Sequence, residues 1–536
     1  MGVISARMRW FEKRGTSLRI IAVVTVFLIC GGSSLAQKRA AIPAAQVAAE
    51  VRNYRLANED RIMRELTEFL AIPNVASDTE NIQKNAAHLM EMLEARGIET
   101  HLLPISGRGP VVFGKLNAPD AKRTVIFYAH YDGQPVDPAA WTDGKPFEPV
   151  LRSDAIEAGG KRIPFPENSA SHHAVYDDKW RIYARSASDD KSPIVALLAA
   201  IDALRAQRIP LGVNLKVIFE GEEEAGSGNL ERTLQLHRNL LGGDLLITAD
   251  GPVHQSGRPL VFFGNRGILG FQITTYGPIR ALHSGHYGNW APNPGFQLAR
   301  LLASMKSIDG HALIEGFYED VTPLGNTEKK ALAEMPDNDA ELERELQFGA
   351  PEGGGQRLVE LLQLPSLNIR GLRSAYVGEQ AQNIVPDKAE AALDVRLVKG
   401  EDPDKKFELV LAHIRKQGFH VTADVPTKEE RLSHPYVARV VKDVWSYRAS
   451  RTSMGLPVSK ALVQVVQDAM GGNAVIAPTL GGSVPMYIFE DLGLPWIGVP
   501  IVNYDNHQHS SDENLRLGQF WRGIEEYGAI LADLSW

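Results

Sequence analysis

The sequence has only one cysteine, Cys30, among 536 residues. It lies within the first 36 residues, which we expect to be removed as an export signal. The mature chain would then have no disulfide, no cysteine nucleophile and no thiolate metal site. Any bound metal ion must be held by His, Asp and Glu side chains.

A hydrophobic run long enough to cross a bilayer comfortably is also lacking. Near the N-terminus, several basic residues precede an apolar run of only ten residues, Ile20 to Ile29. Small residues at Ser34 and Ala36 favour cleavage before Gln37, so residues 1–36 are predicted to be a signal peptide. We expect an exported protein, periplasmic or secreted, without a stable membrane span; an uncleaved anchor is the alternative.

Basic stripes interleaved with aromatic residues are absent, and the formal net charge is −8. Such stripes are typical of proteins that follow a phosphate backbone, so nucleic acid is not an expected partner. No internal repeat is evident. The length exceeds what one compact core accommodates, which favours two domains.

Short apolar runs that alternate with helical stretches predict an α/β domain with a mostly parallel sheet. Three runs end in polar side chains: residues 125–129 precede His130, residues 215–219 precede Glu220 to Glu224, and residues 245–249 precede Asp250. In open α/β sheets, ligands bind just beyond the carboxyl ends of the strands. We therefore expect these side chains to meet at one edge of the sheet.

The alternation in Gly267 to Thr275 differs from these runs and predicts a strand of an antiparallel sheet with one covered face. A second alternating stretch runs from Ala389 to Val398. We therefore place an inserted α+β domain at residues 266–399, between catalytic parts at 37–265 and 400–536.

Each motif alone has an ordinary structural explanation. His130 could be a loop residue, Asp189 the start of a helix, Asp250 a turn residue, and a histidine in 507–509 a surface residue. The carboxylates of residues 220–224 would repel one another unless a cation neutralised them. Together these residues form an oxygen and nitrogen ligand set suited to two divalent ions. Spacing alone does not say which glutamate binds metal and which accepts a proton.

The ordered motifs resemble the M20 family of metallopeptidases, which includes carnosinase-like dipeptidases, glutamate carboxypeptidase and aminoacylase. The resemblance covers nearly the whole mature chain. It implies a zinc-exopeptidase-like catalytic domain with two zinc ions and an inserted lid domain that commonly dimerises. Manganese or cobalt would fit the same ligands.

The resemblance also assigns roles at the metal centre. Glu223 aligns with the general base, Asp132 with the residue that orients a histidine ligand, and Asp189 with a bridging carboxylate that is often followed by a cis peptide. The implied metal ligands are His130, Asp189, Glu224, Asp250 and His509. His507 is left as a bystander or as a residue that contacts a ligand rather than the metal.

In the inserted domain, His283 matches a lid histidine that reaches the partner's active site in a homodimer and stabilises the oxyanion. Asn383 and Arg396 match positions that grip the substrate, and Gly482 and Ser483 match a loop that contacts its carboxylate. A guanidinium suits bidentate binding of a terminal carboxylate.

The sequence departs from the family pattern before the acidic pair. Where the family has Gly-Arg-Gly, this chain has Ala184-Arg185-Ser186, and Ser192 replaces another usual glycine. Side chains at these positions put the backbone geometry of the loop in question. Residues 148–175, which include His172 and His173, also look longer than the family needs.

These observations predict a two-metal hydrolase that cleaves a peptide bond of small peptides near a free C-terminal carboxylate. An N-acyl amino acid amidohydrolase would use the same centre on another substrate. A binding module that has lost activity is a more remote alternative.

Overall fold

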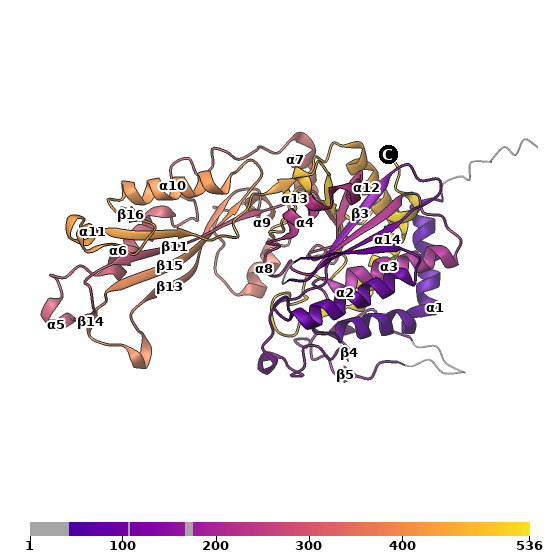
Figure 1. Cartoon of the computed structure of the whole chain (residues 1–536), viewed down its shortest axis with the longest axis horizontal. Coiled ribbons are helices and arrows are strands. Elements are labelled where there is room, and N and C mark those ends of the chain that lie inside the picture. The colour runs from indigo at the N-terminus through magenta and orange to yellow at the C-terminus, as the bar shows by residue number, and fades with distance from the viewer. Residues whose placement is uncertain (1–41, 106–107, 167–174) are drawn as a thin grey trace, which may run out of the picture. The chain divides into compact units, whose positions relative to one another are not determined.

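The computed structural model describes residues 42–105, 108–166 and 175–536 (Figure 1). The predicted signal peptide, together with His172 and His173, lies outside the described residues, so the export signal stays a prediction. Within the described ranges, no helix has the length and apolar character needed to span a membrane.

An eight-stranded mixed sheet forms the centre of the catalytic part. Its strands, in spatial order, are β1 (Glu99–Leu103), β2 (Val111–Leu116), β7 (Asn214–Glu220), β3 (Thr124–His130), β8 (Leu245–Thr248), β20 (Trp496–Gly498), β9 (Leu260–Phe262) and β19 (Val475–Ala477). The four neighbours β7, β3, β8 and β20 are parallel, and β1 and β2 pair antiparallel at one side. The predicted α/β class with parallel central strands is confirmed.

Both faces of this sheet are buried. On β3, Val125, Phe127 and Ala129 belong to one apolar core, whereas Ile126 and Tyr128 belong to the other. A strand covered on both faces reads as a continuous apolar run, which is the pattern seen in the sequence.

Helices supply the cover on each face. The first core contains side chains of α1 (Ala44–Leu70), α2 (Thr79–Glu94), α3 (Lys191–Ala206), α12 (Pro457–Ala469) and α14 (Leu517–Asp533). The second core contains side chains of α4 (Leu230–Leu236) and α13 (Tyr487–Asp491).

A small antiparallel sheet joins the C-terminal motif to the segment that precedes Asp189. Its strands, in order, are β21 (Asn514–Arg516), β6 (Arg181–Tyr183), β4 (Val150–Arg152) and β5 (Arg162–Ile163). Asn514 pairs with Tyr183. Residues more than 300 positions apart are thereby hydrogen-bonded beside the predicted metal centre.

The inserted part is built on a five-stranded sheet. Its order is β13 (Ser366–Ser374), β15 (Lys388–Leu397), β11 (Gly267–Tyr276), β17 (Val437–Lys442) and β16 (His420–Thr422). Helices α6 (Pro294–Met305) and α10 (Pro403–Lys416) pack against this sheet (Figure 1).

The five-stranded sheet extends past residue 399, where the sequence placed the end of the inserted domain. Strands β16 and β17 and helix α10 all follow residue 399. Their side chains belong to the same apolar core as those of the five-stranded sheet. The predicted boundary coincides instead with the end of the long strand β15. The later strands are shorter, so their alternation is too brief to mark them in the sequence.

Two short strand pairs complete the inserted part and its junction. Strands β12 (Leu282–His283) and β14 (Ile384–Val385) pair with each other. Strands β10 (Gly264–Asn265) and β18 (Ser450–Arg451) pair where the chain leaves and rejoins the catalytic part.

The remaining helices are short. They are α5 (Ser284–Tyr287), α7 (Asn326–Glu334), α8 (Asp339–Leu346), α9 (Leu358–Leu361) and α11 (Lys428–Ser433), with 3₁₀ turns η1 (Pro138–Ala140), η2 (Arg238–Leu240) and η3 (Gly378–Gln380).

A buried ion pair joins helix α10 to the connection between β15 and α10. Lys406 Nζ lies 2.6 Å from Glu401 Oε1, and both side chains are buried. Lys406 also donates to the carbonyl of Phe317, while Glu401 accepts a 2.8 Å hydrogen bond from the Val398 N–H.

Replacing Lys406 by methionine should lower the free energy of unfolding by about 3 kcal/mol, because it leaves Glu401 buried without its cation. Chemical denaturation measures this change. Lys416→Met is the matched control, since Lys416 on the same helix pairs with Glu315 at the surface and should have no measurable effect. A Lys406→Met protein as stable as wild type would contradict the assignment.

Candidate functional site

The predicted ligands meet at the carboxyl ends of the parallel strands. His130 is the last residue of β3, Glu223 and Glu224 follow β7, and Asp250 follows β8. Asp189 lies just before α3, and the peptide bond between Asp189 and Asp190 is cis, as the resemblance implied. These four segments and the one that carries His509 surround one point, as expected for the ligand edge of an open sheet.

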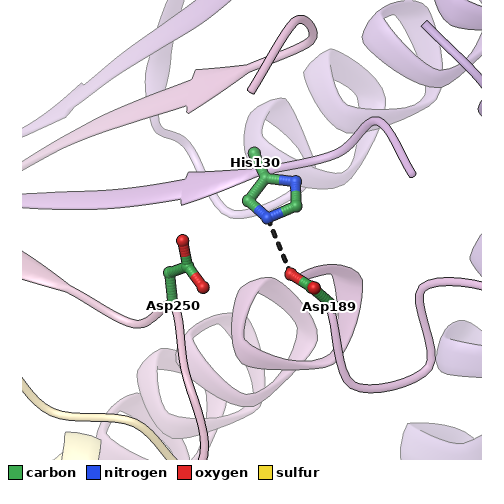
Figure 2. A group of neighbouring side chains, drawn as sticks. All are labelled: His130, Asp189 and Asp250. Carbon is green, nitrogen blue, oxygen red and sulfur yellow. Dashed lines mark hydrogen bonds and ion pairs between the residues drawn. The ribbon is translucent and has the colours of Figure 1, made fainter. Parts of the chain in front are cut away.

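One ligand group consists of His130, Asp189 and Asp250. Each offers a ligand atom, and these atoms all lie within 4.8 Å of one another. Figure 2 shows the three side chains pointing toward one another, with His130 Nε2 2.9 Å from Asp189 Oδ1. This spacing suits one metal ion.

The second ligand group consists of Asp189, Glu224 and His509, again within 4.8 Å. His509 Nε2 lies 3.2 Å from Asp189 Oδ2 and 3.5 Å from Glu224 Oε2. Asp189 belongs to both groups and offers a different oxygen to each. A carboxylate shared in this way is the usual bridge of a two-metal site.

The charges of the site fit divalent cations. Burial, followed by the nearby Asp189, raises the pKa of Glu224 to about 8 and that of Asp250 to about 6. Carboxylates are driven toward their neutral form when no cation compensates them. The donors are imidazole nitrogens and carboxylate oxygens, which zinc, manganese and cobalt accept.

Asp132 contacts both His130 and the turn that carries Glu223 and Glu224. The nearest atom of Asp132 to His130 Nδ1 is its backbone oxygen, at 3.1 Å, while its carboxylate Oδ1 lies at 3.5 Å. The carboxylate accepts hydrogen bonds from the N–H groups of Glu223 and Glu224, at 3.1 and 3.0 Å. Asp132 therefore holds both histidine and glutamates in place.

Sequence analysis missed Glu513, which holds the loop before the cis peptide. Its buried carboxylate accepts hydrogen bonds from the N–H groups of Ser186, Ser188 and Asp189, each at 2.9 Å, and from Arg185 Nη1 at 2.7 Å. Glu513 stands only four residues after His509, but nothing in that spacing indicates which loop it contacts.

Ser186 explains the departure from the family pattern. Its φ is 61°, a left-handed conformation that glycine adopts without steric cost. The Glu513 bond to its N–H helps to hold this conformation. The loop geometry that usually depends on glycine is thus kept with a serine.

A cavity of about 770 Å³ opens from the metal-ligand groups toward the inserted part. Glu223, Glu224 and His509 line one wall. Arg396, Gly482 and Ser483 line another, and Arg396 Nη1 donates a 2.7 Å hydrogen bond to Ser483 Oγ. Six predicted site residues, from four separate parts of the sequence, thus line this cavity.

Three further residues line the cavity that no sequence motif indicated. They are Arg370 on β13, and Trp445 and Tyr447 in the loop after β17. Burial raises the pKa of Tyr447, with Glu223 adding to the effect. These side chains come from a strand and a loop whose local sequences carry no recognised pattern.

Two predicted lid residues lie together but away from this cavity. His283 pairs with Ile384 across β12 and β14, and the Ser284 N–H donates to the carbonyl of Asn383 at 2.9 Å. Neither His283 nor Asn383 lines the cavity described above. His507 also points elsewhere, with Nε2 3.4 Å from Glu157.

Comparison with known proteins agrees with this geometry. The family model for peptidase family M20/M25/M40 matches residues 126–533. The chain is 26% identical to the Cys-Gly metallodipeptidase of Candida albicans, over 88% of this chain and 94% of that protein. It is 24% identical to human beta-Ala-His dipeptidase, over 89% and 91% of the two chains.

Solved structures show the same fold. An M20 family metallo-carboxypeptidase from Sulfolobus solfataricus is 30% identical and superposes with a TM-score of 0.71, over 88% of this chain and 99% of that one. Human carnosine dipeptidase 1 is 20% identical with a TM-score of 0.71, over 91% and 98% of the two chains. From the family match over most of its length, this chain belongs to peptidase family M20/M25/M40.

Proposed function

We propose that this hydrolase cleaves dipeptides with a free C-terminal carboxylate, with two divalent metal ions and Glu223 as general base. The observation that carries the proposal is the pair of ligand groups that share Asp189 and open into a cavity with Arg396 on its wall. Two relatives of the chain are named as dipeptidases, which supports dipeptides as the class of substrate.

His130, Asp189 and Asp250 would hold one ion, and Asp189, Glu224 and His509 the other. Zinc is favoured by this ligand set, and manganese or cobalt would also fit. When bound, such ions polarise a carbonyl and lower the pKa of water.

Glu223 lines the cavity beside the ligand groups but belongs to neither of them. Burial raises the pKa of its carboxyl group, which favours acceptance of a proton from water. It would take a proton from the attacking water and pass it to the leaving amine nitrogen. Asp132 keeps it in position through the Glu223 N–H.

Arg396 would bind the C-terminal carboxylate, together with Ser483 and the backbone at Gly482. Its guanidinium already donates to Ser483 Oγ, so the two side chains are held as one binding surface. A planar guanidinium matches the two oxygens of a carboxylate. This arrangement would place the scissile bond between Arg396 and Glu223.

Glu223→Gln should lower kcat on dipeptides at least about 100-fold while the protein keeps its metal, because the amide cannot accept the proton. Steady-state kinetics and metal analysis of the same sample measure both effects. Glu222→Gln is the matched control in the same turn, since Glu222 bonds to Asn229 instead.

The substrates for that test should include dipeptides, C-terminally amidated dipeptides and N-acyl amino acids. The proposal predicts hydrolysis of the free dipeptides only. A Glu223→Gln protein with more than a tenth of wild-type turnover would contradict the role of Glu223 as general base. Preferential cleavage of N-acyl amino acids would show that these, and not dipeptides, are the substrates.

Without metal, the protein should lose stability as the pH rises from about 5 to about 9. The raised pKa values of Glu224 and Asp250 mean that the folded chain keeps protons that the unfolded chain releases near pH 4. The hydrogen bond to Asp189 raises the pKa of His509 to about 9, so the folded state also keeps this proton longer. Stability falls wherever the folded state binds more protons.

Melting temperatures in EDTA and in excess zinc or manganese, measured across this pH range, test that prediction. Metal should raise the melting temperature, and more so at high pH, because the ligands must be deprotonated. Melting curves that do not respond to metal would contradict the proposed centre.

We also propose a homodimer formed through the inserted part, in which His283 completes the partner's site. Its support is that His283 is exposed and away from the cavity of its own chain, with Ile279 and Trp290 exposed nearby in sequence. A histidine donor could stabilise the oxyanion that forms on the scissile carbonyl.

His283→Ala and Glu223→Gln should each be inactive alone, but co-expressed in equal amounts they should recover about a quarter of wild-type activity. Half of the dimers are then mixed, and each mixed dimer has one complete site. Light scattering checks the dimer. Full activity of His283→Ala, or no recovery in mixed dimers, would contradict this role.

A further inference from the structure

Arg370 occupies an irregular position on β13. Ile369 pairs with Leu393 and Gly371 pairs with Ala392, so Arg370 is an extra residue without a partner on β15. A bulge of this kind re-aims a side chain and is frequent beside active sites. The side chain of Arg370 lines the same cavity as Glu223.

The loop after β17 is fixed so that it faces Arg370. The Asp443 N–H donates to Gly270 O at 2.8 Å, and Tyr447 and Ile268 exchange two backbone hydrogen bonds at 2.8 and 2.9 Å. A side chain at position 270 would displace the Asp443 carboxylate, because a Cβ there would lie 2.2 Å from Asp443 Oδ2. The backbone therefore leaves room for the Asp443 carboxylate and holds it in place.

Arg370 is oriented by two side chains of this loop. Its Nη2 donates to Asp443 Oδ2 at 2.7 Å, and its guanidinium carbon lies 5.2 Å from the ring centroid of Trp445, which also lines the cavity. In the described part of the chain, Asp443 is the sole hydrogen-bond partner of this guanidinium. Its remaining N–H donors are free to bind a ligand.

Arg370 and Arg396 start from well-separated backbone positions. Arg396 pairs with Ser366, four residues before Arg370 on β13, which is roughly 13 Å along the strand. This separation suits two acceptor groups on one substrate better than a single carboxylate shared by both. The charges on this side of the cavity also favour anions. Buried Arg266 lies behind Arg396, so three arginines contribute positive charge. Asp394 and Asp443 neutralise two of these three charges, and one positive charge remains.

We propose that Arg370, held by Asp443 and Trp445, forms a subsite that selects dipeptides with an acidic side chain. This inference rests on the proposed dipeptidase function, in which Arg396 takes the C-terminal carboxylate. The free N–H donors of Arg370 bind the second carboxylate. Trp445 covers one side of the Arg370 guanidinium and the bound carboxylate. It limits their contact with water, which strengthens the hydrogen bonds between them.

The test compares kcat/KM of the metal-loaded full chain on Ala-Glu and Ala-Gln, and on Glu-Ala and Gln-Ala. Each pair differs only in charge, and the two pairs separate the two side-chain positions. Wild type should prefer the acidic member of at least one pair. Arg370→Met should lower that preference about tenfold, the loss expected for one charge-assisted hydrogen bond.

Arg373→Met is the matched control. Arg373 lies on the same strand, but its exposed guanidinium bonds to Glu390 and does not line the cavity. This variant should keep the wild-type preference.

Asp443→Asn should change the preference for the acidic dipeptide in the opposite direction. It keeps an oxygen acceptor for Arg370 but removes the competing charge, so this preference should rise.

Two results would overturn the subsite alone. One is a wild type that cleaves the neutral dipeptides as well as the acidic ones, and the other is an acidic preference that Arg370→Met does not reduce. Absence of all dipeptide hydrolysis overturns the proposed function and the subsite together.

Discussion

The site depends on the position of one carboxylate, that of Asp189. It belongs to both ligand groups, with one oxygen near His130 and the other near His509. A small shift of Asp189 would disturb both groups at once. The loop that carries Asp189 must therefore be held firmly.

Glu513 provides that restraint from the far end of the chain. Three N–H groups of the loop and the Arg185 guanidinium all bond to its buried carboxylate. The pairing of β21 with β6 brings Glu513 to the loop, and His509 lies in the connection just before β21. The same strand pair thus positions a ligand and the residue that fixes the shared carboxylate.

Much of the candidate metal site could be predicted because the end of a buried strand is visible in the local sequence, where an apolar run meets a polar residue. His130 and Asp250 directly follow apolar runs, and the topology of a parallel sheet brings such residues together. The structure groups His130 and Asp250 with Asp189, and Glu224 and His509 with Asp189, so all five implied ligands meet. The roles of these residues in catalysis stay predictions.

The missed features depend on contacts between segments distant in sequence. Glu513 and Arg370 act through partners that no local pattern reveals, and the bulge at Arg370 exists only in the register between β13 and β15. The end of the inserted domain was predicted at residue 399, before the last two strands of the five-stranded sheet. Strand β16 has three residues and β17 has six, which is too few for a clear alternation. Asp132 was predicted as a neighbour of His130, but the hydrogen bonds from Glu223 and Glu224 to its carboxylate were not predicted.

The pairing of β21 with β6 also governs when the centre can exist during protein synthesis. When synthesis has passed β20, the eight-stranded and five-stranded sheets have all their strands, but His509 and Glu513 have not yet been made. A nascent or prematurely ended chain therefore lacks one ligand and the anchor of the shared carboxylate. The two ligand groups can therefore come together only after residues 509–513 have been made.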